Sequence, residues 1–198
     1  MTEGISKSAV RRQLRAILNA MSEAEQRSAS LSACSRVAQT PEFIRARVVM
    51  LYLSTPTELD TAPLALRAWQ AGKTVAVPRV SWDQRRMLPI EITSLHTNIE
   101  LTGPGVREPT SGAPIPIDLI DLVIVPALGF SEDGHRIGRG MGFYDRFLAQ
   151  EEFMGVSCGL GFEQQVLPTL PVQPHDMPLA MIVTDQSVRR FASHAIAH

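Results

Sequence analysis

The residues best suited to chemistry lie in a glycine-rich segment, residues 129–145, which reads GFSEDGHRIGRGMGFYD. Three of its glycines alternate with other residues and leave backbone N–H groups without side-chain cover: Gly138, Gly140 and Gly142. Backbone amides at the start of a helix attract anions, phosphate above all. Arg136 and Arg139 add fixed positive charges that can grip two phosphate oxygens at once. The segment therefore predicts a phosphate site.

Other interpretations of the same segment stay open from the residues alone. Its spacing is neither the Walker A pattern nor the dinucleotide pattern, so no standard nucleotide motif identifies a ligand. Glycines at a turn between a strand and a helix often serve backbone geometry only. Asp145 could hold a Mg²⁺ ion that bridges phosphates, or it could simply favour the positive end of the helix dipole.

The flanking elements would place this segment at the edge of a sheet. Residues 121–127 form an apolar run typical of a buried strand, and Phe143 to about Glu151 should form a helix. In an open α/β sheet, ligands bind outside the carboxyl ends of the strands. The predicted phosphate site therefore lies where such folds usually bind ligands.

The rest of the chain predicts helices that alternate with strands. The first helix is expected because five apolar residues fall on one helical face: Val10, Leu14, Ile17, Leu18 and Met21. The second helix is expected to begin at a capping box at Ser22 and to stop before Pro41. A third helix is expected over 61–71, with strands over 48–53, 73–80, 87–93, 155–161 and 179–184 and long loops over 94–117. This order predicts a three-layer α/β/α fold with a mostly parallel central sheet, as a single domain over residues 1–198.

Composition and charge exclude several classes of protein. The 198 residues include 19 Lys+Arg and 20 Asp+Glu, which gives a formal net charge of -1. A chain this close to neutral lacks the positive field needed for non-specific nucleic-acid binding. The chain has two isolated cysteines, and its sequence shows neither a signal-peptide pattern nor a run of ~20 apolar residues. We therefore expect a cytoplasmic protein without a membrane anchor. Only two basic residues are lysines, Lys7 and Lys73, which singles each of them out.

The residues resemble those of the 5-formyltetrahydrofolate cyclo-ligase family. The glycine-rich segment, continuing as Arg146-Phe147-Leu148, is similar to that family's signature and is the most specific part of the likeness. Further landmarks agree in order and cover nearly the whole chain: Lys7 to Arg11, Leu53 to Thr61, Val77-Pro78-Arg79, Gly105 to Pro109 and His175-Asp176-Met177.

The resemblance implies an ATP- and Mg²⁺-dependent enzyme that converts 5-formyltetrahydrofolate to 5,10-methenyltetrahydrofolate and releases ADP and phosphate. It also implies a fold of the kind grouped with sugar-phosphate isomerases and CoA transferases. The expected partners are these small molecules alone, and the expected state is a monomer. Two rival hypotheses are a non-catalytic nucleotide- or folate-binding member of the fold and, by fold analogy only, a sugar-phosphate isomerase.

The resemblance also implies a role for each site residue. Arg139 and Arg136 would be catalytic, and Asp145 and Asp176 would hold Mg²⁺. ATP contacts are implied at Lys7, Arg11, Arg136, Gly138, Arg139, Gly140, Met141, Gly142, Phe143 and Tyr144. Folate contacts are implied at Leu53, Glu58, Arg139, Gly140, Met141, Gly142 and Phe143.

Each assignment has a purely structural alternative. Lys7 and Arg11 share a helix face and could form a solvated basic surface. Glu58 could be a loop carboxylate or the partner of a surface arginine, and Asp176 could be a turn residue. Phe143 and Tyr144 could pack in the core, and the loop histidines His135 and His175 are assigned no role.

One position departs from the family pattern. Met141 stands where the family often has lysine, and it brings no charge to a phosphate. We expect the remaining cations to suffice, because the neighbouring glycines, arginines and Asp145 are intact; the alternative is a divergent member with altered activity.

Overall fold

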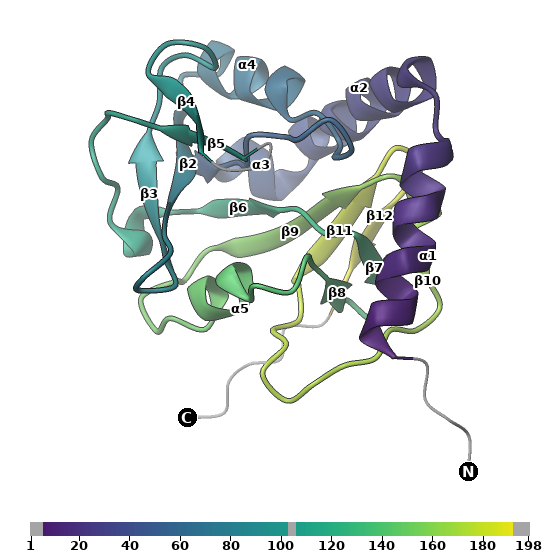
Figure 1. Cartoon of the computed structure of the whole chain (residues 1–198). Helices are drawn as coiled ribbons and strands as arrows, with labels where there is room; N and C mark the ends of the chain where they lie inside the picture. Colours follow the sequence, from purple (N-terminus) through teal and green to yellow (C-terminus); the bar gives the residue numbers. More distant parts are fainter. Residues whose placement is uncertain (1–5, 103–105, 192–198) are drawn as a thin grey trace.

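The protein is organised around a seven-stranded sheet with the order β12-β11-β9-β6-β1-β2-β3 (Figure 1). The structure, a computed structural model, describes residues 6–102 and 106–191. The strands of this sheet are β1 (Val48–Met50), β2 (Thr74–Ser81), β3 (Arg86–Glu91), β6 (Leu122–Val125), β9 (Val156–Gly161), β11 (Met181–Thr184) and β12 (Val188–Arg190). The five inner strands pair in parallel, and only the edge strands β3 and β12 are antiparallel to their neighbours. The predicted mostly parallel sheet is confirmed.

Side chains of the inner strands alternate between two separate cores. Val49 and Leu122 belong to the core beneath the long helices, whereas Met50 and Val123 belong to the core on the other face. Burial on both faces explains why these strands read as continuous apolar runs.

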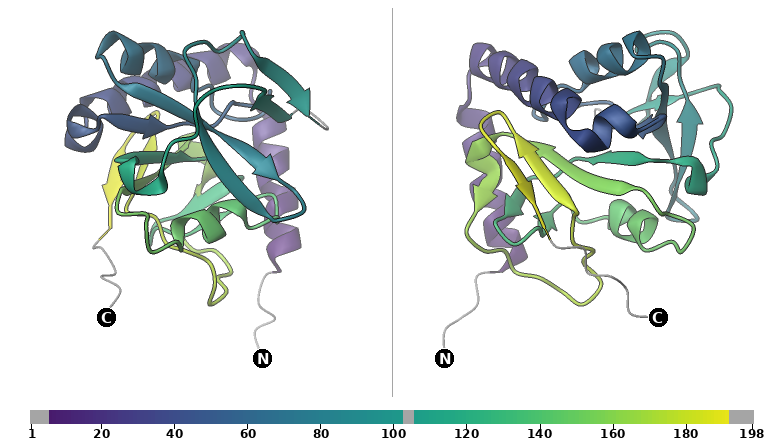
Figure 2. Two further views of the ribbon diagram at one scale, coloured as in Figure 1. Left: turned by 90° about the vertical axis from the view of Figure 1, so that its left-hand side faces the viewer. Right: turned by 180° about the vertical axis from the view of Figure 1, so that it is seen from behind.

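Helices cover both faces of the sheet, as predicted. The helices are α1 (Lys7–Ala20), α2 (Glu23–Gln39), α3 (Pro41–Arg45), α4 (Ala62–Gln70) and α5 (Phe143–Leu148). Helices α2 and α4 lie together on one face and α5 lies on the opposite face (Figures 1 and 2). The capping box at the start of α2 is present, with Ser22 and Glu25 each accepting a backbone N–H of the other residue. No described helix is long and apolar enough to cross a membrane.

The structure corrects the sequence expectations at several places. Residues 94–117 were expected to be loops, but they contain an antiparallel hairpin of β4 (Ile99–Thr102) and β5 (Val106–Pro109). Both strands are short, and β4 is largely exposed to solvent, so the sequence shows little alternation of apolar and polar residues there. Strand β1 ends at Met50, which leaves Leu53 in the following loop, and α5 ends at Leu148 rather than near Glu151. Gly105 lies outside the described residues.

The glycine-rich segment is also more structured than predicted. It contains β7 (Gly129–Ser131) and β8 (Arg136–Ile137), which form a small sheet with β10 (Val166–Leu167). The short α3, β10 and β12 were not anticipated, and neither were the 3₁₀ turns η1 (Ile117–Leu119) and η2 (Glu163–Gln165).

Close contact at Gly129 docks α1 against the small sheet. A Cβ atom at Gly129 would lie 2.5 Å from Cδ1 of Leu14, a fully buried residue of α1. Only glycine permits this approach. The docking fixes α1 beside the glycine-rich segment and therefore fixes where Lys7 and Arg11 can reach.

A charged cluster joins η2 to the last hairpin of the large sheet. Arg189 donates two hydrogen bonds to Glu163, from Nη2 to Oε1 at 2.5 Å and from Nη1 to Oε2 at 3.1 Å, and the hydroxyl of Thr184 donates to the same carboxylate. These bonds, led by the one from Arg189, lower the pKa of Glu163 from 4.5 to about 2.

We therefore predict a pH-dependent cost for Glu163→Gln. A carboxyl with a lowered pKa stabilises the folded state above its unfolded pKa and loses this effect as pH falls through its folded pKa. The variant should be less stable by on the order of 2–3 kcal/mol at neutral pH, and the gap should narrow between pH 4.5 and about 2. Urea unfolding across this range measures the gap, with the exposed Glu152→Gln as the matched control; a gap independent of pH contradicts the prediction.

Candidate active site

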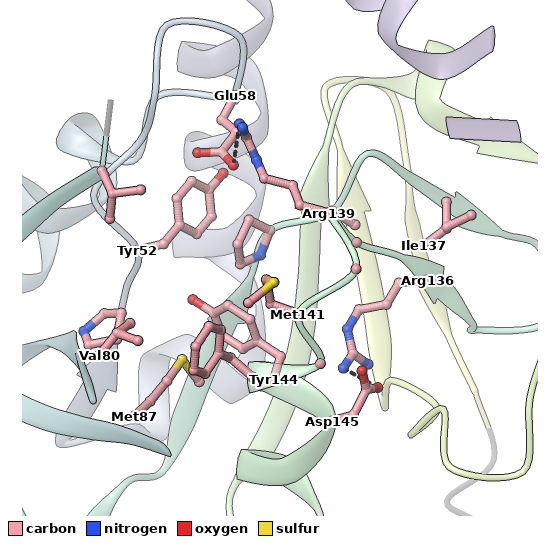
Figure 3. Close-up of a pocket in the computed structure, with 18 of the residues that line it drawn as sticks. Tyr52, Glu58, Val80, Met87, Arg136, Ile137, Arg139, Met141, Tyr144 and Asp145 are labelled. Carbon is pink, nitrogen blue, oxygen red and sulfur yellow. Dashed lines mark hydrogen bonds and ion pairs between the residues drawn. The ribbon is translucent and has the colours of Figure 1, made fainter. Parts of the chain in front are cut away.

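A cavity of about 310 Å³ collects every site residue expected from the sequence. Its lining comes from α1, the loop after β1, the β2–β3 hairpin, β5, the glycine-rich segment with the start of α5, and the loop around residue 175. Figure 3 shows the cavity with Arg136 and Asp145 on one side and Tyr52, Val80 and Met87 on the other. We refer to these two sides as the polar end and the apolar end.

A buried ion pair anchors the polar end. Nη2 of Arg136 lies 2.7 Å from Oδ1 of Asp145, and Nη1 donates to the carbonyl of Met177 at 2.6 Å. The amide of Met177 in turn donates to Oδ1 of Asp145 at 3.1 Å. Burial lowers the pKa of the Arg136 guanidinium, and the negative charge of Asp145 opposes that shift. Two chain segments far apart in sequence are thus fixed on one guanidinium.

A second ion pair ties α1 to the loop around residue 175. Nζ of Lys7 lies 2.6 Å from Oδ2 of Asp176 and donates to the side chain of Gln173 at 3.1 Å. Burial raises the pKa of Asp176, but hydrogen bonds from Lys7 and from the amide of Gln173 outweigh it, so the pKa lies below its usual value. Arg11 reaches the glycine-rich segment, where its Nε donates to the carbonyl of Gly138 at 2.9 Å. A simple solvated basic face is therefore wrong for Lys7 and Arg11.

The carboxylates suit a metal shared with a ligand better than one held by protein alone. Within the described residues, no cluster of three or more His, Cys, Asp or Glu side chains is placed to hold a metal ion. Asp145 and Asp176 both line the cavity and both already face a cation. Mg²⁺ is commonly bound by one or two carboxylates together with substrate phosphates, and this donor set fits that arrangement.

Backbone geometry at the glycine-rich segment requires glycine at two positions. Gly140 has φ 106° and Gly142 has φ 64°, both in the region that side chains disfavour. Gly142 precedes the first turn of α5, and no side chain caps that turn. The backbone N–H groups there stay available to an anion at the cavity.

The apolar end is lined by buried phenols and aliphatic side chains. The hydroxyl of Tyr52 donates to the carbonyl of Leu59 at 2.8 Å. Burial, reinforced by the charge of Glu58, raises the pKa values of Tyr52 and Tyr144, so both phenols stay neutral. Phe143 lines the same cavity and also packs against the second core. The end therefore offers flat apolar surfaces to a ring.

Glu58 and Arg139 meet between the two ends (Figure 3). Nη2 of Arg139 lies 3.2 Å from Oε1 of Glu58 and donates to the hydroxyl of Thr55 at 2.9 Å. The other oxygen of Glu58 accepts the amide of Thr55 at 2.9 Å. Both oxygens of this carboxylate are thus engaged within the protein.

Arg146 links the glycine-rich segment to the β2–β3 turn. Its Nη2 donates to the carbonyl of Met141 at 2.6 Å, and its Nε donates to the carbonyl of Arg85 at 2.8 Å. The guanidinium also lies 5.3 Å from the ring of Phe143, which meets Trp82 edge to face at 5.3 Å. We call this set the Arg146 clasp.

Several residues that line the cavity had no individual role assigned from the sequence: Tyr52, Thr55, Trp82, Met87, Arg107, Glu108 and Gln173. Trp82 and Met87 belong to the β2–β3 hairpin, whereas Arg107 and Glu108 belong to the β4–β5 hairpin. For Trp82, the available sign in the sequence was an aromatic residue in the predicted turn between two strands. The others reach the cavity through long-range packing that local spacing does not encode.

Comparison with known proteins gives one consistent result. The chain matches the 5-formyltetrahydrofolate cyclo-ligase family over residues 3–185. It is 28% identical to the 5-formyltetrahydrofolate cyclo-ligase of Mus musculus, covering 94% of this chain and 97% of that protein. It is 30% identical to the enzyme of the same name from Escherichia coli, covering 85% and 94%. The solved structure of Aquifex aeolicus 5,10-methenyltetrahydrofolate synthetase superposes with a TM-score of 0.82 at 28% identity, covering 98% of this chain and 100% of that one.

We predict that Arg146→Gln loosens the cavity wall without unfolding the protein. The guanidinium is exposed, so stability should change by no more than about 1–2 kcal/mol. Trp82 should nevertheless become more accessible, because Phe143 loses its partner in the clasp. Acrylamide quenching in a Trp69→Phe background reports Trp82 alone, since the chain has two tryptophans. Arg15→Gln is the control on an exposed arginine of α1, and quenching equal to that control contradicts the clasp.

Proposed function

Because the chain belongs to the 5-formyltetrahydrofolate cyclo-ligase family, we propose that it catalyses the ATP-dependent cyclisation of 5-formyltetrahydrofolate to 5,10-methenyltetrahydrofolate. ADP and phosphate are the other products. The observation that carries this proposal is one cavity with a cationic polar end and an apolar aromatic end. A triphosphate suits the first and a reduced pterin suits the second.

The chemistry explains why both substrates must share one cavity. A formamide oxygen is a weak nucleophile and a poor leaving group. When it attacks the γ-phosphorus of ATP, the bond to ADP breaks and an imidate-like phosphate forms. The lone pair of N10 then attacks the activated carbon, the C–O bond breaks, phosphate leaves, and N10 gives up its proton. Phosphoryl transfer of this kind asks the protein mainly for positioning and charge neutralisation.

The cations of the polar end are proposed to bind the phosphate chain. Lys7 and Arg11 approach from α1, and Arg136 approaches from β8. Arg139 is about half exposed and lies between the polar end and Glu58, so it is placed to contact the transferring phosphoryl group and the folate together. The free amides around Gly140 and Gly142 add neutral donors for the same oxygens.

The folate is proposed to occupy the apolar end. Leu53 is buried in the loop after β1, and Phe143 and Tyr144 present ring surfaces at the start of α5. Glu58 stands at the boundary with the polar end, where it orients Arg139 and faces the pterin. A buried ring binds here through apolar contact and a few directed hydrogen bonds.

Asp145 and Asp176 are proposed to hold Mg²⁺ together with the phosphates. When bound, the ion neutralises phosphate charge, as in other phosphoryl-transfer sites. Arg136 and Lys7 orient these two carboxylates, because each cation contacts a carboxylate oxygen directly. The monomeric state and the cytoplasmic location expected from the sequence stay predictions.

Purified protein should convert 5-formyltetrahydrofolate to the methenyl product only when Mg²⁺ and ATP are present. Absorbance of the methenyl chromophore and release of ADP measure the reaction.

Lys7→Gln should raise the KM for ATP about tenfold or more, because a charge-assisted contact to phosphate is lost, and should leave the KM for folate unchanged. Arg15→Gln on the same helix is the control. If ligands bind but neither chromophore nor ADP forms, the non-catalytic hypothesis is correct.

Met141→Lys should strengthen ATP binding. The Met141 side chain is 52% exposed at the cavity, and its carbonyl is already held by Arg146, so a longer cationic side chain fits without repacking. An added charge near the phosphates should lower the KM for ATP by about threefold to tenfold. Met141→Gln provides a neutral control of similar length. Equal constants for all three proteins would mean that this side chain does not face the phosphates.

A further inference from the structure

Glu108 is a buried carboxylate that the proposed reaction has not yet used. It lies on β5, lines the cavity and is 7% exposed. Measured over the whole residue, it is the least exposed of the described Asp, Glu, Lys, Arg and His residues, although the Arg136 side chain taken alone is 5% exposed. A buried charge is costly to the folded protein unless it is paired or hydrogen-bonded.

The protein satisfies only part of this carboxylate. The amide of Val80 on β2 donates to Oε1 of Glu108 at 3.0 Å. No other hydrogen bond and no ion pair reaches Glu108 from the described residues. Its neighbour Arg107 donates instead to the carbonyl of Ser54 at 3.3 Å, and its cross-strand partner is another acid, Glu100. The second oxygen therefore stays open as an acceptor.

Glu108 lines the cavity and is held by Val80, a residue of the apolar end. Val80, which holds Glu108, lies beside Met87 and away from Arg136 and Asp145 (Figure 3). Glu58, the other glutamate of the cavity, has both oxygens engaged by Arg139 and Thr55. Of the two glutamates, Glu108 is the one with an oxygen that accepts no hydrogen bond from the described residues.

We propose that Glu108 is a substrate-positioning residue whose free oxygen accepts ring N–H donors of the reduced pterin. This inference rests on the proposed function. A reduced pterin carries amino and ring N–H groups, and an ionised carboxylate is the strongest side-chain acceptor for them. The donors compensate a charge that the free protein leaves poorly paired. A site that must satisfy such a group selects rings that carry the matching donors.

Glu108→Gln separates this role from a purely structural one. The glutamine carbonyl can still accept the amide of Val80, so β5 stays attached to β2, while the negative charge is removed. Calorimetry without nucleotide should show binding of 5-formyltetrahydrofolate weakened about 10- to 100-fold, with MgATP binding unchanged within about twofold. The melting temperature of the free variant should change little, because the glutamine carbonyl still accepts the amide of Val80 and no described cation loses a partner. Glu100→Gln makes the same charge change on the paired strand and should leave both affinities unchanged.

The outcomes distinguish this inference from the proposed function. If the wild-type protein forms no methenyl product and binds no folate, the proposed function fails. If the wild type binds folate and Glu108→Gln binds it equally well, the role of Glu108 is overturned while the function stands. Loss of folate affinity in Glu58→Gln alone also overturns it. Should Glu108→Gln not fold, Glu108→Asp keeps the charge but retracts the carboxylate, and unchanged folate affinity in that variant again overturns the role.

Discussion

The direct contact between α1 and β7 is the constraint on which the site depends. Leu14 can pack against the strand only because Gly129 has no side chain. From that docked position, Arg11 reaches the carbonyl of Gly138 and Lys7 reaches Asp176, which is 169 residues further along the chain. This contact between the Leu14 side chain and Gly129 therefore helps to bring the first helix, the glycine-rich segment and a late loop to the same cavity.

The two ion pairs of the polar end, Arg136 with Asp145 and Lys7 with Asp176, reduce the repulsion among the cations that line it. Several cations gathered for a polyanion repel one another when the ligand is absent, and desolvation lowers the pKa of the most buried, Arg136. Pairing Arg136 with Asp145 and Lys7 with Asp176 balances each local charge in the free protein. In the proposed function, phosphate oxygens would replace each carboxylate beside its cation, and a metal ion would replace each cation beside its carboxylate. No charge would then be left unpaired.

The sequence predicted the inner strands and the first helices because burial on defined faces leaves a periodic pattern, and the capping box at Ser22 marked its helix directly. The site residues that the family resemblance implied all line one cavity, and their individual roles stay predictions. The sequence did not predict the β4–β5 hairpin, where Leu101 is 69% exposed and alternation is weak. Glu108 and Arg146 fall in segments that resemble the family, but neither received a role, because their contacts are made across the fold.

The rarity of lysine in this chain does not by itself mark a lysine as functional. Nζ of Lys73 donates to the carbonyls of Ile44 and Ala46, at 3.0 and 2.6 Å, and lies 5.1 Å from the ring of Phe43, so it closes the end of α3. Lys7 also binds two acceptors, the side chains of Asp176 and Gln173, but it lines the cavity. One of the two lysines therefore holds the scaffold together and the other belongs to the candidate site, so the role of each follows from its contacts and not from its rarity.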